Sequence, residues 1–171
     1  MVDHGLILSA LPGRYRRNLA IAMEGERLRG YRHPPRSVSW LTRLVRRAQY
    51  LLIVALFNVF PLPQKSGFRR AFAYAGESVD RGYSLLVFPE GRTTDDGRMQ
   101  RFMGGIGLLA SDLSLPVVPI KIEGLFELKQ KRKYFSRPGA VSITFGEPAS
   151  FAPGTDPAEI TKDLEARVAA L

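Results

Sequence analysis

Residues 84–94 read SLLVFPEGRTT and pass within a few positions from an apolar run to a polar segment that contains a glycine. The first part, residues 84–88, is typical of a buried strand in an α/β sheet. Ligands in such sheets bind beyond the carboxyl ends of the strands. The stretch therefore predicts a strand followed directly by a candidate binding loop.

Helical and strand-like patterns alternate on both sides of this stretch. We expect helices at 5–11, 40–57, 68–81 and 106–113 and from Asp156 onward, strands at 18–23, 84–88, 116–122 and 141–145, and a loop at 30–39. Pro61 and Pro63 are expected to end the helix that begins at residue 40. This alternation predicts an α/β fold with a largely parallel sheet flanked by helices. With 171 residues, the chain is expected to form a single domain, 1–171.

The composition excludes several kinds of chemistry. The chain has no cysteine, which excludes disulfides, thiolate nucleophiles and cysteine-ligated zinc. It has two histidines, His4 and His33, which are too few for a multi-histidine metal site. We therefore expect neither a cysteine-ligated nor a multi-histidine metal site.

Positive charge is concentrated in two regions of a chain whose formal charge is +9. Residues 14–47 contain ten arginines against two acids, Glu24 and Glu26. The second basic cluster consists of Lys129, Lys131, Arg132, Lys133 and Arg137. Such surfaces attract anionic lipid headgroups, nucleic acid or phosphorylated substrates, although solvated charge can also serve solubility alone. For the first region we favour a functional interpretation, because arginine predominates and an apolar segment follows.

The longest apolar run, residues 48–60, is interrupted by Gln49 and Asn58. It is shorter than the ~20 residues that cross a bilayer. A buried or interfacial helix is the better interpretation.

The polar part of the opening stretch has the composition of a phosphate-ester site. Gly91 lets the backbone approach a ligand, and Arg92 can form two hydrogen bonds with phosphate oxygens. The hydroxyl of Thr93 can supplement them, and Glu90 can hold an arginine or bond a substrate hydroxyl. An ordinary polar turn after a strand remains the alternative on these residues alone.

Four blocks of the sequence resemble one known family in composition, order and spacing. Residues 88–91 match the Phe-Pro-Glu-Gly block of the lysophosphatidic acid and glycerol-3-phosphate acyltransferases. Phe102 with residues 104–107 resembles the segment that leads into the family's next helix, and residues 115–120 resemble its Val-Pro-Ile block. Residues 57–63 stand where the family has its second motif. The resemblance covers about residues 3–150.

The resemblance implies an O-acyltransferase of phospholipid synthesis that acts on a lysophosphatidic acid-like acceptor. The acyl donor is acyl-CoA or acyl-carrier protein as a co-substrate, and no bound metal or cofactor is needed. Gly91, Arg92 and Thr93 would bind the acceptor phosphate, with Glu90 as a catalytic residue of the same loop. Residues 14–47 and 40–60 would hold the domain peripherally or monotopically on the cytoplasmic face of a membrane, where anionic lipid is a partner and nucleic acid is not.

Two departures from the family pattern concern the phosphate site. The family block usually continues Thr-Arg-Ser, whereas here the arginine comes one place earlier, at Arg92. The family's second motif normally supplies another arginine. In this chain Lys65, Arg69 or Arg70 must take that place.

The third departure concerns the family's first motif, His-x-x-x-x-Asp, in which the histidine is the general base. Asp3 corresponds to its aspartate, so the histidine is expected before Met1. His4 and His33 cannot replace it, because Ser9 and Val38 stand five places after them. We therefore expect a domain that is incomplete at its N-terminus, lacks its first strand and is inactive without the upstream histidine. A non-catalytic lipid-binding remnant or pseudoenzyme and, less favoured, a basic nucleic-acid-binding module are the alternatives.

Overall fold

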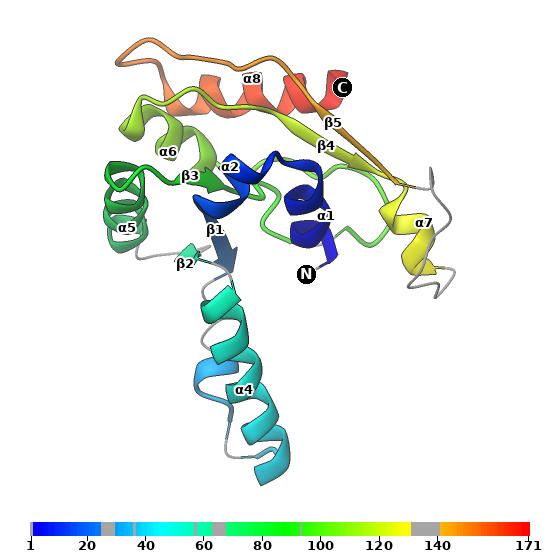
Figure 1. Ribbon diagram of the computed structural model, residues 1–171. Helices are drawn as coiled ribbons and strands as arrows, with labels where there is room; N and C mark the ends of the chain where they lie inside the picture. Colours follow the sequence, from blue (N-terminus) through cyan, green and yellow to red (C-terminus); the bar gives the residue numbers. More distant parts are fainter. Residues whose placement is uncertain are drawn as a thin grey trace. The chain divides into compact units, whose positions relative to one another are not determined.

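The computed structural model describes residues 2–24, 30–35, 37–56, 58–62, 68–92, 94–130 and 141–171. The chain divides into two compact units, residues 13–88 and residues 1–12 with 89–171. Each unit has its own strands and helices, labelled in Figure 1. We name them the Gly13–Phe88 unit and the Pro89–Leu171 unit, the latter including Met1–Pro12.

The Gly13–Phe88 unit is built on a parallel three-stranded sheet. Its strands are β1 (Leu19–Glu24), β2 (Asn58–Leu62) and β3 (Ser84–Leu86), in the order β2-β1-β3. In the central strand, Ile21 is in register with Val59 on one side and Leu86 on the other. Residues 19–22 of this strand are all buried, as expected of a parallel strand covered on both faces. The structure confirms the predicted α/β class with a parallel sheet flanked by helices.

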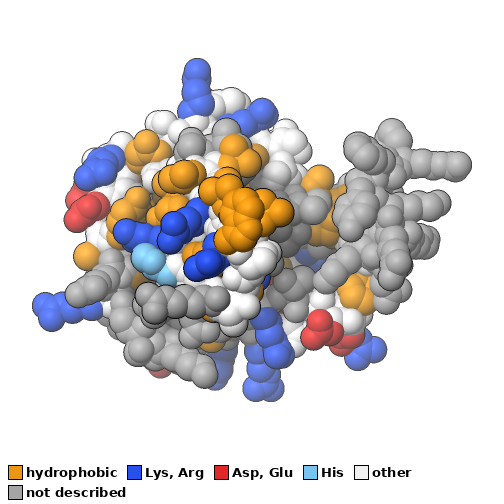
Figure 2. All heavy atoms as spheres, turned by 90° about the horizontal axis from the view of Figure 1, so that it is seen from below, with side chains coloured by type: hydrophobic (Ala, Val, Ile, Leu, Met, Phe, Trp, Pro, Cys, Tyr) orange, Lys and Arg blue, Asp and Glu red, His pale blue; other side chains and the backbone are white. Residues whose placement is uncertain are grey.

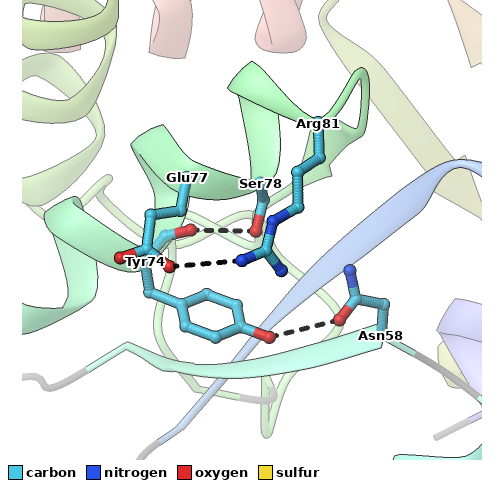
Figure 3. A network of polar contacts seen from close by, with 5 residues as sticks. All are labelled: Asn58, Tyr74, Glu77, Ser78 and Arg81. Carbon is cyan, nitrogen blue, oxygen red and sulfur yellow. Dashed lines mark hydrogen bonds and ion pairs between the residues drawn. The ribbon is translucent and has the colours of Figure 1, made fainter.

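Helix α5 (Phe68–Asp80) packs on this sheet through small residues and one aromatic stack. Ala71, Ala75 and Ser78 are buried. The ring of Tyr74 stacks on Phe60 of β2 with centroids 5.6 Å apart. Figure 3 shows the polar contacts nearby: Tyr74 Oη donates to Asn58 Oδ1 (3.3 Å), Ser78 Oγ donates to the Tyr74 carbonyl (2.8 Å), and Arg81 pairs with Glu77 (3.8 Å). The ring stack on Phe60 and the bond to Asn58 join α5 to β2, whereas the other two contacts lie within α5 and the turn that follows it.

The unit also contains α2 (Gly13–Arg17) and α4 (Trp40–Leu56). Within the unit, α4 extends away from the sheet (Figure 1), and most of its large apolar side chains are exposed. No helix in the described part of the chain is both long and apolar enough to cross a membrane.

The Pro89–Leu171 unit contains α1 (Val2–Ala10), α6 (Gly105–Leu113), β4 (Ile120–Glu123), α7 (Leu125–Gln130), β5 (Ser142–Phe145) and α8 (Pro157–Ala170). Strands β4 and β5 are antiparallel, with Ile122 opposite Ile143. A bridge between Val117 and Ala149 extends the pairing. The strand pattern of the sequence predicted both segments, but their pairing is antiparallel rather than part of the parallel sheet.

Helices α6 and α8 enclose the core of this unit. Ala110, Ala149, Ile160 and Leu164 are buried together there. Gly107 lies so close to α8 that an added Cβ would overlap the Pro157 carbonyl oxygen and the Thr161 hydroxyl. The N-terminus of α8 confirms the predicted cap, because Asp156 Oδ1 accepts a hydrogen bond from the Ala158 N–H (3.0 Å).

Several sequence-based boundaries were wrong. The helix that begins at Trp40 ends at Leu56, before both prolines, and Pro61 lies inside the unpredicted strand β2. Because β2 is an edge strand of its sheet, a residue without an N–H is tolerated there. Residues 30–32 are helical rather than part of a loop. The strands expected at 84–88 and 116–122 are shorter, and helices α2 and α7 were not predicted.

Candidate functional site

The candidate site is the loop 89–104, which follows the Gly13–Phe88 unit and leads to α6 in the Pro89–Leu171 unit. The loop closes on itself where the Met103 N–H donates to the Pro89 carbonyl (2.8 Å). Gly91 has a φ of +67°, in the left-handed region that favours glycine. The glycine of the sequence motif thus turns the chain immediately after Glu90.

Gln100 joins two of the predicted site residues. Its backbone N–H donates to Glu90 Oε2 at 2.8 Å, and its side-chain Oε1 accepts from Arg92 Nη2 at 3.0 Å. Its amide nitrogen also donates to the Arg98 carbonyl at 3.3 Å. Gln100 therefore braces the carboxylate and orients the guanidinium. Sequence reasoning missed this residue, since a glutamine ten positions from the glutamate carries no pattern that marks it.

A compact turn at residues 94–98 shapes the far side of the loop. Thr94 Oγ1 accepts from the Gly97 N–H (3.0 Å) and donates to Asp96 Oδ1 (2.8 Å). Asp96 Oδ1 also accepts from the Arg98 N–H (3.0 Å). The Arg98 N–H and then the Thr94 hydroxyl lower the pKa of Asp96, because both stabilise its charged form.

Two contacts hold the loop on the helices of its unit. Gly97, with φ +80°, lies against α7, where an added Cβ would be 2.7 Å from Cδ1 of Phe126. The Phe102 N–H donates to Glu165 Oε2 of α8 at 2.7 Å. A carboxylate acceptor makes the second bond stronger than a neutral one. The loop is thus anchored at its turn and at its end.

Glu90 and Arg92 differ in their exposure to solvent, and this difference suggests different roles for them. Glu90 and Gly91 are half-buried, whereas Arg92 is exposed together with Arg98 and Arg101. An exposed guanidinium held from one side by an amide can bind a phosphate ester with its remaining donors. The half-buried carboxylate of Glu90 accepts a backbone N–H, which stabilises the loop; a catalytic role for Glu90 stays a prediction.

Other predicted residues lie partly or wholly outside the described residues. Asp3 belongs to α1, but its side chain and that of His4 are outside them. Thr93, Lys65, Lys131, Arg132, Lys133 and Arg137 lie wholly outside the described residues. For Arg70 and Lys129, the other member of the basic cluster, only the side chain lies outside them. His33 is exposed, and Arg69 is exposed on α5, in the other unit from Arg92. Among the described residues, no group of three His, Asp or Glu side chains is placed to hold a metal ion.

Comparison with known proteins assigns the family. The family model described as Acyltransferase matches residues 36–123, a span from just before α4 to the end of β4 that includes Glu90, Arg92 and Gln100. The chain belongs to the acyltransferase family. This confirms the resemblance drawn from the Phe-Pro-Glu-Gly block. Asp3 lies outside the matched range.

Individual relatives point the same way. The chain is 34% identical over 95 residues to a 1-acyl-sn-glycerol-3-phosphate acyltransferase of Pseudomonas aeruginosa, covering 54% of this chain and 36% of that protein. It is 32% identical over 70 residues to one from Limnanthes alba, covering 41% of this chain and 25% of that protein. The chain thus matches about a quarter to a third of the length of these relatives.

A solved structure shows the same fold. The 1-acyl-sn-glycerophosphate acyltransferase PlsC of Thermotoga maritima superposes with a TM-score of 0.58. The match covers 90% of this chain and 55% of that chain, at 20% sequence identity. At this identity, the likeness supports the α/β acyltransferase fold of the chain.

Proposed function

We propose that this chain is part of an O-acyltransferase that moves a fatty acyl group to a hydroxyl of a lysophosphatidic acid-like acceptor. One observation carries the proposal: in a family member whose relatives are named for this reaction, Gln100 holds Glu90 and Arg92 in a single braced loop. The acyl donor is acyl-CoA or acyl-carrier protein, which acts as a co-substrate. We propose no resident metal or cofactor.

The residues of the loop take distinct parts in this proposal. Arg92 binds the acceptor phosphate, because its guanidinium is exposed and held by the Gln100 amide. Gly91 lets the phosphate approach the backbone, and the Thr93 hydroxyl adds a donor. Glu90 supports catalysis by holding the loop closed through the Gln100 N–H. Asp3 corresponds to the aspartate of the family's His-x-x-x-x-Asp motif, in which it would orient the histidine that activates the acceptor hydroxyl.

The proposal places the reaction at the cytoplasmic face of a membrane that contains anionic lipid, with no nucleic acid partner. The net charge of +9 and the arginines of residues 14–47 support attraction to such a surface. The acceptor itself is a lipid, so the loop must work next to the bilayer that supplies it.

Acyl transfer is the direct test. The longest protein encoded by the reading frame that contains this chain is incubated with labelled acyl-CoA or acyl-carrier protein and with lysophosphatidic acid. We expect acylation of lysophosphatidic acid, and much less of monoacylglycerol, which lacks the phosphate. Binding of lysophosphatidic acid without turnover by either donor would favour a lipid-binding remnant instead.

Replacing Arg92 tests the phosphate site. A charge-assisted contact contributes ~1.5–3 kcal/mol, so Arg92→Ala should lower kcat/KM for the phosphorylated acceptor about 10- to 150-fold. The acceptor KM should carry most of the change, because the phosphate is held in both ground and transition states. Arg92→Lys should recover part of the loss, since an ammonium cannot make the two-pronged contact.

Arg98→Ala and Arg101→Ala are the matched controls, because both arginines are exposed in the same loop. They should leave the acceptor KM within about 3-fold, the scale of an exposed charge contact. Loss of acceptor binding in one of these variants, with Arg92→Ala unaffected, would move the phosphate site to that residue.

A further inference from the structure

Helix α4 carries an exposed apolar surface that the acyl-transfer loop does not explain. The exposed fraction is 70% for Trp40, 57% for Leu44, 66% for Leu51 and 59% for Leu52. Leu41, Val45 and Val54 are exposed as well. Leaving so many large apolar side chains of one helix in water is unfavourable, so this surface is suited to bind an apolar partner.

The apolar side chains of α4 lie along one half of the helix. At 100° per residue, Trp40, Leu44 and Leu51 lie in line, with Leu41, Val45 and Leu52 beside them. Arg43 and Arg47 follow the margin of this half, and together with Trp40 and Leu44 they line a shallow hollow. The hollow lies among an indole, an aliphatic side chain and the side chains of two arginines, residue types that suit a hydrocarbon chain with an anionic headgroup beside it.

Charge decides between possible partners. Helix α4 has three arginines and no acid in its 17 residues. The Gly13–Phe88 unit has 14 Lys and Arg against 4 Asp and Glu, a formal charge of +10, whereas the remaining residues total −1. Figure 2, seen from below Figure 1, shows hydrophobic side chains with Lys and Arg directly among them. An anionic bilayer offers negative charge and hydrocarbon together, so it matches both features of this surface.

We propose that α4 lies in the plane of an anionic bilayer surface, with its apolar half in the acyl-chain boundary and a lipid phosphate between Arg43 and Arg47. The indole of Trp40 then sits at headgroup level, where tryptophan is favoured. The inference specifies how the proposed membrane location is achieved. Vesicle binding by α4 can be measured without acyl transfer, so a failure of the membrane contact can be told apart from a failure of the proposed activity.

Trp40 is the only tryptophan of the chain, which makes it an internal probe of this contact. Fluorescence and vesicle flotation are measured for the full chain with phosphatidylcholine vesicles, with and without phosphatidic acid. We expect flotation and a blue-shifted Trp40 emission with the anionic vesicles, and quenching by lipids brominated on their acyl chains. Binding should weaken as salt rises, because the charge component is screened.

Removing charge from the hollow tests the phosphate contact. Arg43→Gln/Arg47→Gln should weaken binding to anionic vesicles about 30-fold, equivalent to about 1 kcal/mol per arginine near the surface. The matched control is Arg69→Gln/Arg81→Gln, which removes the same formal charge from two exposed positions of the same unit, one at the start of α5 and one in the turn after it. The control should change binding less than 3-fold. Circular dichroism spectra of all variants establish that they are folded.

Three kinds of outcome would overturn the proposal. The first is a failure of the expected contact, seen as an unchanged Trp40 emission in protein that floats with vesicles or as an equal loss of binding in the Arg69→Gln/Arg81→Gln control. The second is a blue shift that depends on protein concentration without lipid, which would assign the surface to a second copy of the chain. The third is an equal shift with single-stranded RNA, which would assign the surface to nucleic acid.

Discussion

The two units of the chain use their side chains in opposite ways. In the Pro89–Leu171 unit, the polar groups of the loop bond to one another or to α8, and Gly107 leaves no space between α6 and α8. In the Gly13–Phe88 unit, α4 leaves large apolar side chains exposed, and the unit carries the whole positive excess of the chain. One unit thus holds its loop through internal contacts, whereas the other exposes an apolar helix and carries the positive charge.

The largest change in the free energy of unfolding is expected in the Pro89–Leu171 unit, where α6 and α8 pack most closely. Gly107→Ala places a methyl group against the Pro157 carbonyl and the Thr161 hydroxyl, which are held to each other by a 2.8 Å hydrogen bond. Helices α6 and α8 must separate, so we expect a loss of about 3 kcal/mol or more in the free energy of unfolding. Urea denaturation followed by circular dichroism measures it.

Gly104→Ala is the control for this substitution. Gly104 precedes the same helix with a right-handed backbone, φ −58° and ψ −13°, and an added Cβ would meet no atom within 4 Å. Gly104→Ala should change the free energy of unfolding by less than about 0.5 kcal/mol. Equal destabilisation by the two variants would show that the α6–α8 contact is not tight in solution.

The next effect concerns the anchor between the loop and α8. Glu165→Gln removes the negative charge from the acceptor of the Phe102 N–H. Because this bond is partly buried, we expect a loss of about 1 to 2 kcal/mol in stability. Hydrogen exchange of the Phe102 amide should speed up as well. Glu147→Gln, at an exposed position of the same unit, is the control and should leave both quantities unchanged.

A smaller effect is expected at Gln100, and it tests whether this residue positions Arg92. Gln100→Ala removes the Oε1 acceptor but keeps the backbone N–H that binds Glu90. Losing one hydrogen bond of about 1 kcal/mol should raise the acceptor KM about 5-fold at constant kcat. In an Arg92→Ala background the substitution should add nothing, because the two act through one contact. Fully additive losses in the double variant would show that Gln100 does not act through Arg92.

The smallest change in stability is expected in α4. Leu51→Ala shortens a side chain that is 66% exposed, so the free energy of unfolding should change by less than about 0.5 kcal/mol. The same variant should bind anionic vesicles about 5-fold more weakly, since it loses apolar atoms that enter the bilayer. A clear loss of stability would mean that Leu51 is covered by another part of the protein. The contrast between the two units would then disappear.

The sequence by itself determined the features that depend on neighbouring residues. The apolar run before Pro89 predicted strand β3, the Asp156 and Pro157 pair predicted the start of α8, and the spacing of apolar residues predicted α4. Helix periodicity and capping act over a few positions, so they can be recognised without the fold. The Phe-Pro-Glu-Gly block likewise marked the loop and the family.

Only the tertiary structure decided which of these local pieces meet. The pairing of Glu90 with Gln100 spans ten residues and needs the turn at Gly91, and the bond from Phe102 to Glu165 spans 63 residues. The antiparallel pairing of β4 with β5 and the place of Pro61 in an edge strand also depend on partners distant in the sequence. Strand periodicity shows which face of a strand is apolar but not which strand lies beside it, because backbone hydrogen bonds are the same for every residue except proline.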